Sequence, residues 1–220
     1  IKLFQNKTIM KALGNTLLVG FTSAVVSTIL GTLGAIGIFY SKKGAKKVFE
    51  GMTQIPVVNA EIVMALSLAV LFVAVVWKNG FLSLLIGHVV LTIAFVYLSV
   101  KPKLVQLDPN TYEAALDLGA TPNQALIKVV LPEILPGIIA GFMLDFPLSL
   151  DDFIITAFTR DNSFDTLSTY VQGVISKSSI PPELRALTTI IFLFAVVILI
   201  INNFTNKEGK AHSKKRERSF

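Results

Sequence analysis

Residues 108–132 have the sequence DPNTYEAALDLGATPNQALIKVVLP, which contains two helix starts separated by a glycine. Asp108 followed by proline is typical of an N-cap and a first helical position. Gly119 is typical of the residue just past a helix end, because glycine tolerates a positive φ. The pattern therefore predicts a first short helix over about residues 109–118.

The second helix start lies directly after this glycine. Thr121 and Gln124 have the spacing of a capping box, in which each side chain bonds the backbone N–H of the other residue. We expect this second short helix to end near Pro132. The whole loop between the flanking apolar runs, residues 101–135, is too long for a simple turn.

The composition indicates that the rest of the chain lies in lipid. Of the 220 residues, 53% are hydrophobic and 15% are charged, and the mean hydropathy is +0.68. A soluble domain carries about 25% charged residues. We interpret the chain as one all-α polytopic membrane domain.

Five segments are apolar enough to cross a membrane, which takes roughly 20 residues of helix. Three of them lie in runs without charge, apart from Arg185 at the start of the fifth span, and the other two carry acids. The predicted spans are residues 12–40, 56–77, 80–100, 136–158 and 184–204, followed by a basic tail at 207–220.

Close helix packing is expected where small residues recur at short spacing. Gly31, Gly34 and Gly37 recur in the first span, and Gly137 and Gly141 form a G-x-x-x-G pattern at the start of the fourth. Many membrane proteins share such patterns, so they predict packing rather than a function.

The basic residues predict the orientation of the spans, because Lys and Arg favour cytoplasmic loops. With the carboxyl end inside, 13 of the 20 basic residues are cytoplasmic and 7 are outside. We therefore expect the amino end outside and the tail inside, where its charges meet anionic lipid rather than nucleic acid. Since residue 1 is Ile and no signal peptide precedes the first span, we also expect an upstream membrane helix to be missing from this sequence.

The residues of the loop carry a resemblance to a known family. Their spacing is similar to the EAA loop of bacterial binding-protein-dependent ABC importers, apart from Val129, where that family usually has Ile. The matching positions are Glu113, Ala114, Ala115, Gly119, Leu131 and Pro132. The resemblance implies a MetI-like permease core of five transmembrane helices in the inner membrane, with this loop as the coupling helix that docks on an ATPase.

The resemblance also implies partners: a second permease subunit, two cytoplasmic ATPase subunits and a substrate-binding protein outside. The chain has no phosphate-binding loop, so we expect ATP and Mg²⁺ to bind the partner ATPase and no cofactor to bind here. With no cysteine and only two histidines, we predict no catalytic site and no metal site. His88 is expected to be a hydrogen-bonded residue between helices.

Acids within the spans predict a cationic substrate, because a buried acid in a membrane is costly unless it faces a pathway or a partner. These acids are Glu61, Asp145, Asp151 and Asp152, and the spans contain no Lys or Arg apart from Arg185 at the start of the fifth. Asp145 and Asp152 are seven residues apart and fall on one helix face with Gly141, Ser149 and Thr156. We therefore expect Asp152 first and Asp145 second to line the pathway, with Glu61 contributing. Asp151 is a further candidate, although it points to another side of the helix than Asp152.

A second resemblance narrows the predicted class of substrate. Residues 112–122 and 148–156 are similar to the C-type permease subunits of spermidine/putrescine importers, which implies polyamine uptake. The stretch before Glu61, with Asn59 and Ala60, departs from the sequence pattern of that subfamily. An importer for thiamine, an iron complex or an anion stays open as an alternative. A membrane enzyme, a scaffold or a passive channel would leave the docking motif unexplained.

The orientation can be tested by labelling, because the chain has no native cysteine. Cysteines introduced at Lys43, Asn123 and Ser213 should be shielded from an impermeant thiol reagent in intact cells. Cysteines at Asn79 and Ser178 should react. Labelling of position 123 from outside would overturn both the orientation and the docking role.

Overall fold

The computed structural model describes residues 6–75, 80–161, 164–176, 189–190 and 193, and within these ranges all regular elements are helices. The chain divides into two units, residues 11–170 and residues 1–10 with 171–220. The larger unit contains the loop at 108–132 and all four acids of the predicted spans.

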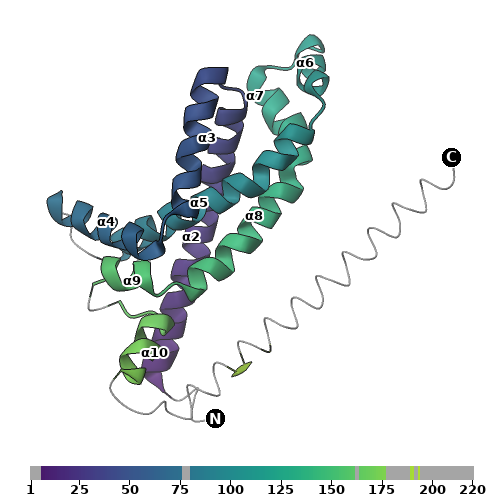
Figure 1. The fold of residues 1–220 in the computed structure, drawn as a ribbon. Coiled ribbons are helices and arrows are strands. Elements are labelled where there is room, and N and C mark those ends of the chain that lie inside the picture. The colour runs from purple at the N-terminus through teal and green to yellow at the C-terminus, as the bar shows by residue number, and fades with distance from the viewer. Residues whose placement is uncertain (1–5, 76–79, 162–163, 177–188, 191–192, 194–220) are drawn as a thin grey trace. The chain divides into compact units, whose positions relative to one another are not determined.

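The described helices follow one another with short connections. They are α2 (Lys7–Phe39), α3 (Lys43–Val58), α4 (Glu61–Ala74), α5 (Phe81–Gln106), α6 (Pro109–Asp117), α7 (Pro122–Ala125), a π-helical turn (Leu126–Val130), α8 (Leu131–Asp151), α9 (Ile154–Thr159) and α10 (Leu167–Ile175). In the larger unit, α6 and α7 lie at one end with the start of α3, and α4 and α9 lie toward the other end (Figure 1).

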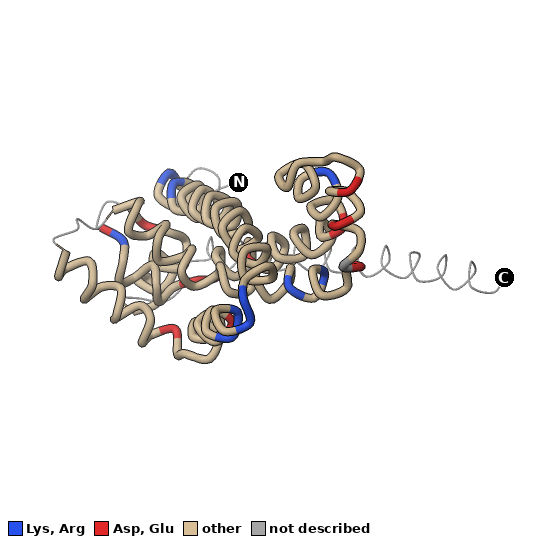
Figure 2. Tube along the Cα trace, turned by 90° about the horizontal axis from the view of Figure 1, so that it is seen from above, with Lys and Arg blue, Asp and Glu red and all other residues tan. Residues whose placement is uncertain are grey.

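Three described helices are long and apolar enough to cross a membrane, namely α2, α5 and the continuous helix over residues 122–151. The number rises to four if the bent pair α3 and α4 counts as one span. Charged residues are sparse along the described trace (Figure 2). The fifth predicted span, 184–204, lies mainly outside the described residues, and the tail at 207–220 lies wholly outside them.

The second predicted span, 56–77, is wrong as a single straight helix. α3 and α4 meet at an angle of 107°, because Asn59 and Ala60 have extended backbone conformations. Pro56 lies in the last turn of α3 and cannot donate a helical hydrogen bond. The prediction failed because hydropathy treats the two segments as one apolar run and does not detect the bend.

The fourth predicted span, 136–158, is also interrupted. α8 ends at Asp151, Asp152 has an extended ψ of 126°, and α9 starts at Ile154. Pro147 lies inside α8 and removes one hydrogen bond shortly before the break. Their spacing predicted that Asp145 and Asp152 lie along one uninterrupted helix. They do not, because the helix ends between them.

Helices α5 and α8 pack closely against each other, and the predicted glycine pair makes this contact possible. A Cβ added at Gly137 would lie 2.9 Å from the carbonyl oxygen of Ser99, and one at Gly141 would lie 3.2 Å from the Cα of Val96. Gly31 meets Val96 from α2, whereas Gly34 and Gly37 have nothing described within 4 Å. Buried residues around this contact form one core: Ala35, Val96, Tyr97, Val100, Leu104, Val130 and Ile134.

Gly137→Ala should therefore destabilise the protein, although alanine is the better helix former. The new methyl group meets a backbone oxygen that cannot rotate away, and overpacking of this kind costs about 1–3 kcal/mol. The matched control is Gly14→Ala, where nothing lies within 4 Å and helix propensity favours alanine by up to ~1 kcal/mol. The apparent unfolding temperature of the detergent-purified protein should fall for the first variant only. An equal or higher value for Gly137→Ala would contradict the packing.

Candidate functional site

The first candidate site is the loop of residues 108–132, and its first helix forms as the sequence predicts. The side chain of Asp108 accepts a hydrogen bond from the backbone N–H of Asn110, at 2.9 Å, and so caps α6. Proline at the first helical position costs nothing, because its missing N–H would have no helical partner there.

The turn after α6 depends on Gly119, which has a φ of +87°. Its N–H donates to the carbonyl of Leu116 at 2.9 Å, and the N–H of Ala120 donates to the carbonyl of Ala115 at 3.0 Å. These bonds satisfy carbonyls at the end of α6 that would otherwise lack a helical partner. The predicted capping box follows, because Thr121 and Gln124 exchange side-chain to backbone hydrogen bonds of 3.0 and 3.4 Å.

The second loop helix does not end near Pro132, so that prediction is wrong. α7 passes through the π-helical turn into α8, and the helix continues to Asp151. The N–H of Leu131 bonds the carbonyl of Leu126, five residues back. This wider turn lets the chain pass a proline that has no N–H for the ordinary i−4 bond. The second part of the loop, from Pro122, is therefore helically continuous with the fourth span.

Most of the predicted docking residues are accessible. Glu113, Ala114, Gly119 and Pro132 are exposed, while Ala115 and Leu131 are half-buried. Leu118, beside the glycine, is 90% exposed, which is unusual for a leucine at a turn. The loop thus presents an apolar tip next to an acidic helix.

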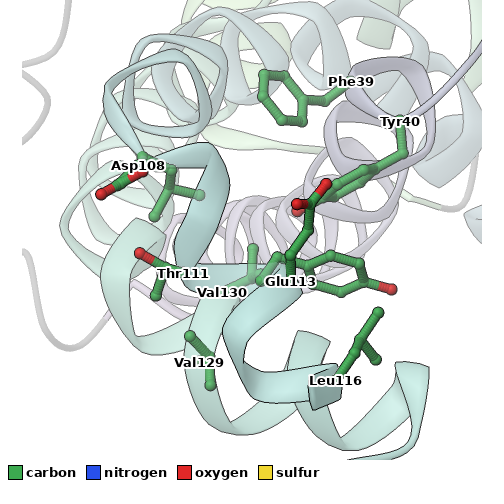
Figure 3. A pocket seen from close by; sticks show the side chains of 10 residues that line it. Phe39, Tyr40, Asp108, Thr111, Glu113, Leu116, Val129 and Val130 are labelled. Carbon is green, nitrogen blue, oxygen red and sulfur yellow. The ribbon is translucent and has the colours of Figure 1, made fainter.

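A pocket of about 340 Å³ lies between this loop and the end of α2 (Figure 3). Tyr40 and Tyr112 line it with ring centroids 5.2 Å apart. The other lining residues are Phe39, Leu107, Asp108, Thr111, Glu113, Leu116, Val129 and Val130. The pocket is thus lined both by α6 and by the end of a candidate spanning helix.

The second candidate site is the break between α8 and α9, where Asp152 caps the new helix. Its carboxyl oxygens accept from the backbone N–H of Ile155 at 3.1 Å and of Thr156 at 2.8 Å. The hydroxyl of Thr156 also donates to Oδ2 at 2.7 Å, and Ser168 donates to the Asp152 carbonyl at 2.8 Å. The break is therefore satisfied by internal partners, as an irregular segment in a membrane requires.

His88 lies against this break from α5. It is 1% exposed, and its Nε2 lies 2.9 Å from the Thr156 hydroxyl and 3.4 Å from Asp152 Oδ2. Its Nδ1 lies 2.7 Å from the hydroxyl of Ser149, which in turn lies 2.7 Å from that of Ser23 on α2. The prediction of a hydrogen-bonded histidine between helices is confirmed, but its acidic neighbour was not foreseen.

Asp145 lies in a different environment and is fully buried. Neither of its carboxyl oxygens has a hydrogen-bond partner within the described part of the chain. Its polar neighbours Ser27 and Thr92 bond each other at 2.8 Å, and Thr92 also donates to the carbonyl of His88 at 2.9 Å. These two hydroxyls therefore form the polar surroundings of Asp145 inside the subunit.

The remaining two acids face outward. Asp151 is exposed and Glu61 is half-buried at the start of α4, and Glu61 interacts electrostatically with both Asp151 and Asp152. Three of the four predicted acids thus converge at the α8–α9 break. Asp145 and Asp152 are buried in the subunit, whereas Asp151 is exposed, and the pathway role of all four acids stays a prediction.

Sequence reasoning missed Ser23 and Ser27, which supply the α2 side of both polar clusters. A signal was present, because Thr16, Gly20, Ser23 and Ser27 fall near one face of α2 at helical spacing. Within the described ranges, no group of three His, Cys, Asp or Glu side chains is arranged to hold a metal ion.

Together, the spanning helices, the exposed helix–glycine–helix loop and the acids at a helix break define a polytopic membrane transport component. The chain belongs to the family described as binding-protein-dependent transport system inner membrane components, which matches residues 27–206.

Curated relatives cover most of the chain. The spermidine/putrescine transport system permease protein PotC of Haemophilus influenzae is 32% identical over 94% of this chain and 80% of its own length. PotC of Escherichia coli K12 is 32% identical over 94% of this chain and 78% of its own length. The putrescine transport system permease protein PotI of the same strain is 34% identical over 86% of this chain and 70% of its own length.

A solved structure shares the fold. It is described as an amino acid ABC transporter with histidines, and it is similar with a TM-score of 0.66 over 88% of this chain and 90% of that one. The sequence identity is 18%, so the likeness concerns the fold alone.

Proposed function

We propose that this chain is a permease subunit of an ATP-driven importer that carries polyamines such as spermidine and putrescine inward. The observation that carries the proposal is the convergence of Glu61, Asp151 and Asp152 at one helix break in a chain similar to permeases named for these substrates. Linear amines carry several positive charges, and carboxylates are the side chains that bind ammonium groups.

The charge distribution supports a cation over an anion. A pathway for phosphate or sulfate would favour Lys or Arg within the spans, and the predicted spans contain only Arg185, at the start of the fifth. Asp151 and Glu61 are accessible, and Asp152 adds a third acid just behind them. In the proposed pathway, the first two exchange contacts with the passing ammonium groups, and Asp152 contributes its field from the buried side.

The proposed driving force comes from partner subunits. The exposed loop around Leu118 docks on one of two cytoplasmic ATPases, which bind ATP and Mg²⁺. The continuous helix from α7 into α8 would transmit ATPase closure directly to the acids at the far end of α8. A second permease subunit completes the pathway, five spans place the amino end outside, and a binding protein delivers substrate near residues 159–182.

Gly119 offers a test of docking. Valine is strongly disfavoured at a φ of +87°, and its strain costs about 1–2 kcal/mol. Gly119→Val should therefore reduce uptake and uncouple ATP hydrolysis while membrane insertion survives. Asparagine tolerates this conformation better, so Gly119→Asn is the matched control and should retain most of the activity. Normal uptake by a stably expressed Gly119→Val protein would count against docking.

The acids can be compared in the assembled importer reconstituted in liposomes. Asp151→Asn and Glu61→Gln should each raise the half-saturating spermidine concentration by about tenfold, the loss expected for one contact to a charged group. Asp145→Asn removes the same charge from the buried side of α8, so its main effect should be on the unfolding temperature. A larger rise for Asp145→Asn than for the other two would sink the proposed pathway.

A further inference from the structure

His88 makes hydrogen bonds in the buried cluster that a residue which only fills space would not need. Both ring nitrogens are engaged, Nδ1 by Ser149 of α8 and Nε2 by Thr156 of α9. These two residues lie on opposite sides of the break at Asp152. A single side chain from α5 therefore joins the end of one helix to the start of the next.

The hydrogens of the cluster can be assigned by counting donors. The Thr156 hydroxyl donates to Asp152 Oδ2 at 2.7 Å, so its oxygen is free to accept from His88 Nε2. A neutral His88 then carries its hydrogen on Nε2, which is also the nitrogen 3.4 Å from Asp152 Oδ2. Nδ1 is left as an acceptor for the hydroxyl of Ser149. The Asp152 carboxylate thus selects the tautomer that points an N–H toward it.

The position of the break matters for the acids. Asp151 directly precedes Asp152, and Glu61 interacts with both. A shift of Asp152 would therefore move or release the whole acidic group. Ser23 extends the same network to α2 through its 2.7 Å contact with Ser149, which fixes the α8 side of the break.

We propose that His88 is a positioning residue for the polyamine pathway. Through its Nε2–H it holds Thr156 and Asp152, and it thereby sets the geometry in which Asp151 and Glu61 meet the substrate. This inference rests on the proposed function for its substrate, but the geometric part can be measured without any substrate.

The two ring nitrogens suggest a matched set of variants. The amide nitrogen of glutamine can reach the place of Nε2, whereas that of asparagine reaches only the place of Nδ1. Phenylalanine keeps the ring shape and makes neither bond. If His88 only fills space, His88→Phe should be the mildest change. If His88 positions Asp152, His88→Gln should be the mildest change.

The experiment uses the whole importer in liposomes, with spermidine as the probe. His88→Phe and His88→Asn should raise the half-saturating spermidine concentration by about tenfold with little change in maximal rate, as expected for one lost hydrogen bond near a charge. His88→Gln should stay within about threefold of the natural protein. Equal effects of Gln and Asn, or unchanged uptake by His88→Phe, would overturn the proposal.

Amide hydrogen exchange of residues 152–159 in the same complexes gives the second readout. Exchange at Ile155 and Thr156 should speed up in His88→Asn and His88→Phe but not in His88→Gln, because Asp152 accepts from those amides. Unaltered exchange in all three variants would refute positioning. If the natural importer takes up no spermidine but the exchange pattern holds, the proposed substrate fails and the positioning role stands. If His88→Phe does not assemble, the comparison of Gln with Asn still decides.

Discussion

The structure of the larger unit depends on satisfying the backbone groups that a helix break would leave without a partner in lipid. A helix that stops inside a membrane exposes N–H and C=O groups, and each unsatisfied group costs several kcal/mol. At the α8–α9 break this cost is offset by Asp152, which accepts from two backbone amides, and by Ser168, which donates to a backbone carbonyl. His88 then joins the two sides of the break. An irregular and charged feature is stable there because the surrounding helices supply its hydrogen bonds.

The same constraint separates acids that resemble one another in sequence. Asp152 is buried but receives backbone and hydroxyl donors, so its carboxylate is stabilised in place. Asp145 is buried on α8 beside the hydroxyls of Ser27 and Thr92. Asp151 is exposed although it adjoins Asp152. We therefore base the proposed transport role on the exposure of each acid and on its donors, and not on the mere presence of an acid in a span.

Sequence patterns predicted what local chemistry determines and missed what depends on tertiary contacts. The cap at Asp108, the positive φ of Gly119 and the exchange between Thr121 and Gln124 were all predicted, because each involves neighbours within a few residues. The bend at Asn59 and the break at Asp152 were not, since hydropathy averages over a window longer than either feature. The side-chain partners of His88 come from α8, α9 and the break between them, and no spacing within one segment could reveal them.

The central claim is that the acids at the helix break serve inward movement of a polyamine driven by a partner ATPase. The most direct measurement is ATP hydrolysis by the complete purified importer in liposomes, with its binding protein supplied either empty or loaded with one candidate solute. The account predicts that spermidine or putrescine stimulates hydrolysis several-fold, whereas thiamine, an iron complex and phosphate do not. Stimulation by one of those three solutes, with no response to either polyamine, would contradict it.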